Sequence, residues 1–208
     1  MATDIKALTE DFFAGRIKPD EFLGSGYYSN VYALDCAEDC VIKIRNEDPN
    51  YSDTRVATDS WLFWALYCII RNHELSVMPR IHALVINFRE AGYAAIMERC
   101  SRTNKTYGVS SRSIEEDLLK MNVSEEQRYD ALRAILEFRE WYSTTFKIFD
   151  DNIYLDTHGA NWMDSADDQL RLTDPYDTSL DRSGYRAIQG RLINWLMQNP
   201  LNNVRIIW

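Results

Sequence analysis

Tyr154-Leu-Asp-Thr-His-Gly-Ala-Asn-Trp-Met163 and the later Leu172-Thr-Asp-Pro175 are the two stretches that decide the fold predicted for this chain. They carry three oxygen-bearing side chains, those of Asp156, Asn161 and Asp174. A carboxylate at position 156 could accept the proton of a hydroxyl group, and Asn161 and Asp174 offer the hard oxygen ligands that Mg²⁺ prefers. Phosphoryl transfer from ATP needs such a set, because its charged transition state requires an oriented acceptor and metal ions held against the phosphate oxygens.

Two interpretations of this loop are open. Asp156 and Asn161 are five positions apart, as are the Asp and Asn of the protein-kinase catalytic loop, and a later aspartate holds Mg²⁺ in that family. The other interpretation is an Asx-rich turn between two strands, in which the same side chains hydrogen-bond the backbone. The loop by itself does not decide between them.

The N-terminal half favours ATP chemistry. Phe22-Leu-Gly-Ser-Gly-Tyr-Tyr-Ser-Asn-Val-Tyr32 predicts a strand, a glycine-rich turn and a strand, and Cys40-Val-Ile-Lys-Ile44 predicts a buried strand with one lysine. In a kinase, such glycines let backbone N–H groups approach the phosphates, Val31 lies against adenine, and Lys43 reaches the α- and β-phosphates. A glycine pair alone is usually a plain hairpin, and a strand lysine is usually an edge residue. The prediction of ATP chemistry therefore rests on the order of these motifs along the chain.

The chain resembles the early serine/threonine protein kinases of T-seven-like short-tailed bacteriophages. The shared motifs are an L-G-x-G-x-x-S-x-x-Y turn, a V-I-K strand, a D-x-H-x-x-N-x-M loop and a T-D-P metal site, which lie between about Phe22 and Tyr176. The resemblance implies an ATP- and Mg²⁺-dependent kinase that phosphorylates serine or threonine on host proteins, in the host cytoplasm. It implies that Lys43 holds the phosphates and that Asp156 orients the acceptor, while Asn161 and Asp174 hold metal.

The chain departs from ordinary protein kinases at several positions. Ser29 replaces the third glycine, His158 occupies a position where many kinases have lysine, and Pro175-Tyr176 replaces the usual Phe-Gly. The D-x-H-x-x-N loop is also similar to that of aminoglycoside-phosphotransferase-like enzymes, which phosphorylate small molecules. His158 could steady the transferring phosphate, or it could be a hydrogen-bonded residue that shapes the loop.

Two alternative functions therefore remain beside the protein kinase. One is a small-molecule phosphotransferase, and the other is a non-catalytic, kinase-shaped protein that inhibits a host factor. The four intact residues Lys43, Asp156, Asn161 and Asp174 argue against the second alternative, since an inactive protein has no need of all four.

Composition limits the partners and the compartment. The 208-residue chain has 46% hydrophobic residues and a net charge of −9, which argues against a general nucleic-acid binder because such proteins need a basic face. Basic proteins or small cationic acceptors fit this charge better. The first residues contain no basic-then-apolar signal segment, so we expect a cytoplasmic protein. The apolar run 61–70 is too short to span a bilayer and predicts a buried helix.

Four cysteines in a chain of this length predict buried free thiols rather than a disulfide framework. Cys36 and Cys40 flank an acidic turn that could bring them close enough for a bond or a metal. No Cys/His set stands nearby to complete a zinc site.

The remaining pattern predicts a coarse order of elements. A first helix covers residues 3–14, strands cover 80–87 and 93–97, and a last helix covers 185–198. The second strand of this pair ends at Met97 and Glu98, where a kinase hinge would offer backbone groups to adenine. The helix after Lys43 would supply an acidic partner for that lysine, and Asp59 is the candidate. The alternative for Asp59 is a first-turn carboxylate near the positive end of the helix dipole. Residues 101–113 predict a polar loop, which is either a solvated connector or a segment whose basic residues pair with a phosphate on one of its own hydroxyls.

Ser113 and Ser124 each fit a capping box that opens a helix. In the second of these helices, Tyr129, Leu132, Ile135 and Leu136 form the predicted apolar face.

These observations predict an α+β, minimal protein-kinase-like two-lobed fold. One domain would span residues 1–208, with a sheet-rich N-lobe over about 1–98 and a reduced helical C-lobe over about 99–208. The candidate catalytic residues are Asp156, Lys43, Asn161 and His158, and the candidate metal ligands are Asn161 and Asp174. The candidate ATP-binding residues are Gly24, Ser25, Gly26, Ser29, Val31, Lys43, Met97 and Glu98.

Overall fold

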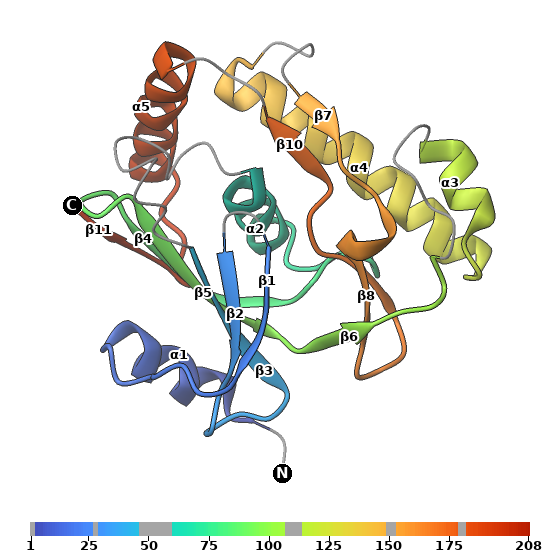
Figure 1. Cartoon of the computed structure of the whole chain (residues 1–208). Helices are drawn as coiled ribbons and strands as arrows, with labels where there is room; N and C mark the ends of the chain where they lie inside the picture. Colours follow the sequence, from blue (N-terminus) through green and yellow to red (C-terminus); the bar gives the residue numbers. More distant parts are fainter. Residues whose placement is uncertain (1–2, 27–28, 46–59, 107–113, 149–152, 179–181) are drawn as a thin grey trace. The chain divides into compact units, whose positions relative to one another are not determined.

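The computed structural model describes residues 3–26, 29–45, 60–106, 114–148, 153–178 and 182–208 (Figure 1). Within them the chain is a mixed α+β protein, as predicted. It divides into two compact units. The first contains residues 1–58, 80–99 and 185–208, and the second contains residues 59–79 and 100–184. Sequence order would assign 59–79 to the first unit and 185–208 to the second, but the contacts within the chain assign them the other way.

The first unit is built on a six-stranded sheet in the order β1-β2-β3-β5-β4-β11. Neighbouring strands are antiparallel except for β11, which runs parallel to β4. The predicted glycine-turn, lysine and hinge strands are all present. The sequence pattern did not predict β11, which follows the last helix. The strands are β1 (Phe22–Ser25), β2 (Ser29–Ala33), β3 (Cys40–Arg45), β4 (Ile81–Asn87), β5 (Gly92–Glu98) and β11 (Val204–Ile207).

Helix α1 (Ile5–Phe13) covers one face of this sheet (Figure 1). Asp4 caps the helix by accepting a hydrogen bond from the backbone N–H of Ala7 at 3.1 Å. The buried side chains of Leu8 and Phe12 pack into a core that includes Ile42 of β3. Because side chains alternate along a strand, this packing turns Lys43 to the opposite face of the sheet.

Helix α5 (Arg182–Gln198) precedes β11 and confirms the predicted last helix. Its buried residues are Ile188, Leu192 and Leu196. The preceding residue, Trp195, is half-buried.

The second unit combines three helices with two small antiparallel sheets. One sheet has the strand order β6-β8-β9, and the other pairs β7 with β10. The elements are α2 (Ser60–Ile70), β6 (Cys100–Arg102), α3 (Ile114–Lys120), α4 (Glu125–Phe146), β7 (Ile153–Leu155), a 3₁₀ turn at Gly159–Asn161, β8 (Trp162–Ser165), β9 (Leu170–Leu172) and β10 (Tyr176–Thr178).

Helix α2 is the centre of an aromatic core, as its all-apolar sequence predicted. Ten of its residues, Ser60 to Ile69, are buried. Its Phe63 ring lies 4.6 Å from that of Tyr142, and its Trp64 ring lies 5.2 Å from that of Phe138, centroid to centroid. The indole N–H of Trp64 also donates to the backbone oxygen of Leu172 at 2.9 Å. The core therefore fixes the end of β9 as well as α4. No helix of the described residues is long and apolar enough to cross a membrane.

The predicted apolar face of α4 was partly wrong. Tyr129 is 66% exposed and Leu136 is 52% exposed, whereas Ile135 is buried. The helix instead buries a face that includes Phe138 and Tyr142, because the aromatic contacts with α2 set its rotation. At its start, Ser124 accepts the backbone N–H of Gln127 as predicted, but the Gln127 side chain donates to Gln169 instead of closing the box. Ser113 lies outside the described residues.

The four cysteines are free thiols, as predicted. Cys40 and Cys68 are buried, but the predicted burial is wrong for Cys36, which is exposed, and for Cys100, which is half-buried. Burial, with the nearby Asp39 carboxylate, raises the pKa of the Cys40 thiol to about 12. Since the thiolate is the form that reacts and binds metal, Cys40 is chemically inert at neutral pH.

We expect Trp64→Phe to lower the free energy of unfolding by about 2 kcal/mol, because it removes buried volume and the hydrogen bond to Leu172. Urea unfolding measures this change. Trp208→Phe is the matched control, since Trp208 is 60% exposed and its replacement should change stability by less than about 0.5 kcal/mol. Equal effects of the two replacements would show that the indole of Trp64 is not a structural anchor.

Candidate functional site

Asp156 lies where the β7–β10 ribbon ends. Leu155 pairs with Tyr176 in the ribbon, and the backbone N–H of Asp156 donates to the oxygen of Pro175 at 2.8 Å. The hydrogen bond continues the antiparallel pairing by one step. It therefore places Asp156 beside the segment that begins with Asp174.

Asn161 closes the loop that Asp156 opens. Its backbone N–H donates to the oxygen of His158 at 2.9 Å, and its side-chain Nδ2 donates to the backbone oxygen of Asp156 at 2.5 Å. Only the NH₂ end of the amide can donate to a carbonyl, so this contact fixes the orientation of the side chain. The oxygen Oδ1 is consequently turned away from the Asp156 carbonyl and keeps its capacity to bind a cation.

Asp174 is half-buried between β9 and β10. Its neighbour Thr173 donates two hydrogen bonds to the backbone oxygen of Asn161, from the backbone N–H at 2.7 Å and from Oγ1 at 2.9 Å. Trp162 and Leu172 are partners in the β8–β9 ladder, so Thr173 and Asn161 form the next pair. The β8–β9 ladder thereby brings Asn161 and Asp174, the two candidate metal ligands, to the same end of this hairpin.

His158 lies close to the carboxylate of Asp156. Its Nδ1 accepts the backbone N–H of Ala160 at 3.2 Å, and its Nε2 lies 3.4 Å from Oδ1 of Asp156. Because Nδ1 acts as an acceptor, the proton of the neutral ring resides on Nε2 and faces the carboxylate. Both side chains are partly exposed, at 47% and 37%. The histidine therefore shapes the loop through Ala160, and its ring lies beside the aspartate.

Buried contacts that the sequence pattern did not predict stabilise the loop between Asp156 and Asn161. The indole N–H of Trp162 donates to the backbone oxygen of Thr157 at 2.9 Å. A side chain at Gly159 would bring its Cβ to 3.3 Å from the backbone oxygen of Thr106, so the neighbouring backbone would have to shift to accept it. Thr106 lies 53 residues from Gly159, beyond any local motif. Trp162, in contrast, follows Thr157 within the same part of the chain.

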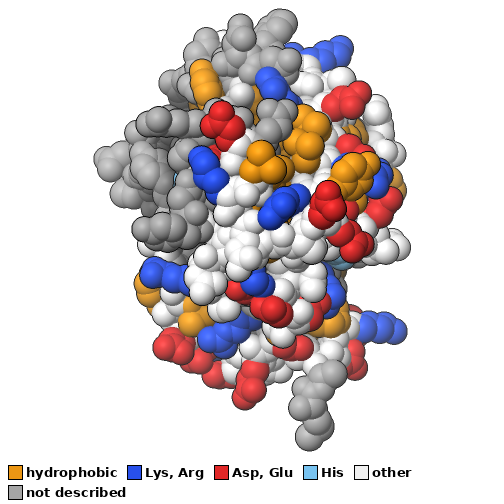
Figure 2. Space-filling model, turned by 90° about the vertical axis from the view of Figure 1, so that its right-hand side faces the viewer, with side chains coloured by type: hydrophobic (Ala, Val, Ile, Leu, Met, Phe, Trp, Pro, Cys, Tyr) orange, Lys and Arg blue, Asp and Glu red, His pale blue; other side chains and the backbone are white. Residues whose placement is uncertain are grey.

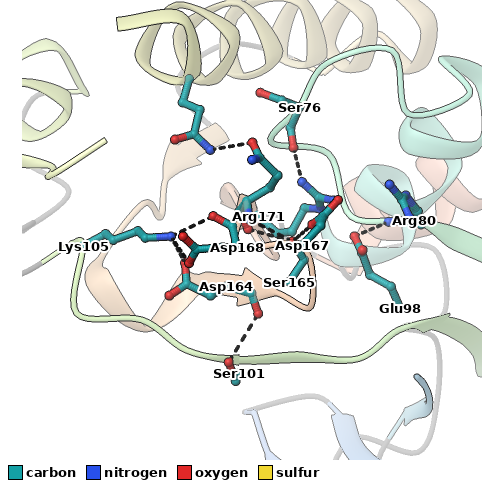
Figure 3. A network of polar contacts seen from close by, with 12 residues as sticks. Ser76, Arg80, Glu98, Ser101, Lys105, Asp164, Ser165, Asp167, Asp168 and Arg171 are labelled. Atoms are coloured by element: carbon teal, nitrogen blue, oxygen red, sulfur yellow. Dashed lines mark hydrogen bonds and ion pairs between the residues drawn. The ribbon is translucent and has the colours of Figure 1, made fainter. Parts of the chain in front are cut away.

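The β8–β9 hairpin has its own polar support (Figure 3). Lys105 forms ion pairs with Asp164 at 2.9 Å and with Asp168 at 2.7 Å. Partial burial by itself lowers the pKa of Lys105, but the two carboxylates raise it above its usual value. Lys105 therefore stays charged at neutral pH. Its ion pairs connect the β8–β9 hairpin to the segment that follows β6.

Arg171 supports the other side of this hairpin. It is buried, and its guanidinium donates to the backbone oxygen of Ser76 and to Asp167. The same serine donates its hydroxyl to Asp130 of α4 at 2.6 Å. These contacts join β9 to the segment after α2 and to α4.

The predicted nucleotide residues of the first unit share one sheet face. Val31, Lys43 and Ala95 are direct neighbours across β2, β3 and β5. Met97 lies two positions from Ala95, so its buried side chain is on the same face, opposite α1. Gly24 pairs with Val31 at the edge.

The glycine turn is closed by its own backbone. The N–H of Gly26 donates to the oxygen of Ser29 at 2.8 Å, so this N–H is already engaged within the hairpin. Ser29 is buried and Ser25 is exposed. A Cβ at Gly24 would meet nothing within 4 Å, and the backbone there has no positive φ. The fold of the described residues therefore does not require glycine at position 24.

Glu98 has a structural contact at the end of β5. Its carboxylate accepts the backbone N–H of Arg80 at 2.8 Å, and its own N–H donates to the oxygen of Arg80 at 2.9 Å (Figure 3). The N–H of Arg99 donates to the oxygen of Asp39. An adenine contact at this position would therefore have to use carbonyl groups rather than these N–H groups.

Lys43 belongs to the first unit, while Asp156, Asn161 and Asp174 belong to the second. Asp59 and residues 107–113 of the polar loop lie outside the described residues. Among the described residues there is no group of three or more His, Cys, Asp or Glu side chains arranged for a metal ion.

Comparisons with known proteins find matches among solved structures and none by sequence. No family model matches the sequence, and no curated protein matches it. Among solved structures, the chain is similar to one from the CAK complex of Chaetomium thermophilum bound to ATP-γ-S. The two are 15% identical with a TM-score of 0.47, and the match covers 88% of this chain and 53% of that one. This chain therefore spans about half the length of that structure's chain.

We expect Thr157→Val to raise the free energy of unfolding by about 1 kcal/mol. Thr157 is fully buried, and its Oγ1 has no hydrogen-bond partner among the described residues. Valine has nearly the same shape and removes this buried polar atom. Urea unfolding of the two proteins measures the difference, and a loss of stability in the variant would contradict the assignment of an unsatisfied hydroxyl.

Proposed function

We propose that the chain is an ATP- and Mg²⁺-dependent phosphotransferase that phosphorylates serine or threonine hydroxyl groups of proteins. The proposal rests on hydrogen bonds that link the segments of three oxygen-bearing residues. Asp156 is bonded to the segment of Asp174 through Pro175, and to Asn161 through the amide Nδ2. These bonds bring the three residues together where the β7–β10 and β8–β9 strand pairs end.

The donor set suits magnesium. Asn161 and Asp174 offer an amide oxygen and a carboxylate, and Mg²⁺ is usually held by one or two such groups together with water and substrate phosphates. A cluster of three protein carboxylates is therefore not required. When bound, the metal would neutralise charge on the phosphate oxygens.

Asp156 would accept the proton of the acceptor hydroxyl. Its carboxylate is partly exposed and can reach a substrate, and the N–H of His158 Nε2 faces one of its oxygens. This leaves the other carboxylate oxygen for the acceptor. Lys43 would bind the α- and β-phosphates, from the sheet face that also carries Val31 and Met97.

The proposed acceptor follows from the net charge of the chain. A net charge of −9 favours basic protein segments. Acidic and basic side chains are interspersed on the face drawn in Figure 2, among the residues described there. Host proteins would be the substrates in a bacteriophage setting, and their phosphorylation would occur in the host cytoplasm.

We expect Asp156→Asn to abolish transfer and to leave ATP affinity nearly unchanged. The amide keeps the volume of the carboxylate but is a poor proton acceptor, and loss of a positioned base costs about 10²–10⁴-fold in rate. Labelled ATP in cell lysate measures transfer, and calorimetry with Mg²⁺-ATP measures affinity.

The distribution of label separates the candidate functions. Label on proteins supports the proposal, while label confined to low-mass products would indicate a small-molecule phosphotransferase. Nucleotide binding with no transfer by the wild type would favour the non-catalytic alternative. Wild-type rates in a folded Asp156→Asn protein would make Asp156 a turn residue only.

We expect Gly24→Ala to weaken Mg²⁺-ATP binding without changing stability. A Cβ at this position meets no atom of the described fold within 4 Å, so only a closely approaching ligand would collide with it. Thermal unfolding without nucleotide should change little, whereas the nucleotide-dependent rise in melting temperature should shrink. Gly159→Ala is the contrasting variant, since its Cβ meets backbone at 3.3 Å and should cost stability with or without nucleotide.

A further inference from the structure

Thr173 makes a contact that the proposed mechanism does not use. Its backbone N–H and its hydroxyl both donate to one acceptor, the backbone oxygen of Asn161, at 2.7 and 2.9 Å. The first bond continues the β8–β9 ladder beyond the Trp162–Leu172 pair, and any residue except proline could make it. The second bond requires a hydroxyl group. It uses the second lone pair of the Asn161 carbonyl.

This hydroxyl acts at the point where the ladder ends. Asn161 belongs to the last pair that the ladder bonds hold, and Asp174 is the first residue beyond that pair on its own segment. An additional bond between Thr173 and Asn161 restrains these two residues at that point.

We infer that Thr173 is a positioning residue, whose hydroxyl holds Asn161 and Asp174 in the mutual register needed to bind the metal of a nucleotide complex. The inference rests on the proposed function. Partners that orient metal ligands without touching the metal commonly contribute tenfold or more to its affinity. Asn161 also donates to the oxygen of Asp156, so the same restraint extends to the residue that faces the acceptor.

The chain allows a sharp pair of variants. Thr173→Val keeps the β-branched shape and the backbone bond but removes the hydroxyl, and Thr173→Ser keeps the hydroxyl. Thr144→Val is the matched control, because Thr144 is exposed on α4 and its hydroxyl donates only to backbone oxygens of its own helix.

The experiment uses the full chain and Mn²⁺, which electron paramagnetic resonance detects when free in solution. Titration in the presence of a non-hydrolysable ATP analogue gives the metal affinity. We expect Thr173→Val to weaken it about tenfold, with Thr173→Ser within about twofold of the wild type and Thr144→Val unchanged. Urea unfolding without ligand accompanies each titration, because a purely structural hydroxyl would change stability and leave metal affinity unaltered.

The outcomes separate this inference from the proposed function. If the wild type binds Mn²⁺ with the analogue and Thr173→Val binds it equally well, the positioning role is wrong and the proposed function stands. Equal losses in the valine and serine variants overturn the role as well, since the hydroxyl would not be the cause. If the wild type binds no Mn²⁺ with the analogue, both the site and the inference fail together.

Discussion

The candidate site depends on the end of the β8–β9 ladder, where the Asn161 carbonyl accepts two hydrogen bonds from Thr173. Asn161 in turn donates to the Asp156 carbonyl, and Asp156 donates to the carbonyl of Pro175. Backbone groups thus carry most of the geometry. The side-chain oxygens of Asp156, Asn161 and Asp174 are the groups proposed to do chemistry, and a charged site of this kind needs its groups preorganised.

The aromatic core around α2 keeps this ladder in place. Trp64 donates to the oxygen of Leu172, and the N–H of Leu172 donates to the oxygen of Val77 after the same helix. Both backbone groups of the residue before Thr173 are therefore held by buried partners. Since packed cores resist small displacements, the helix that precedes the site by about a hundred residues restrains its position.

Much of the fold could be predicted because its signals are local. The apolar run of α2, the lysine-bearing strand β3 and the serine cap of α4 follow from short patterns. The rotation of α4 could not be predicted in the same way. Tyr129 and Leu136 have the right helical spacing for a core face, but contacts of Phe138 and Tyr142 with a distant helix decide which face is buried.

The sequence by itself predicted candidate groups for phosphoryl transfer, since Asp156, Asn161 and Asp174 have the residue types and spacing expected of such a site. It also indicated that α2 would be buried, but it wrongly predicted that Tyr129 and Leu136 of α4 face the core. Only the tertiary structure showed that the Thr173 hydroxyl donates to the Asn161 carbonyl and that β11 joins the sheet beside β4. These features depend on partners that a local pattern does not contain, because hydrogen bonds between separate segments form only once the core has brought those segments together.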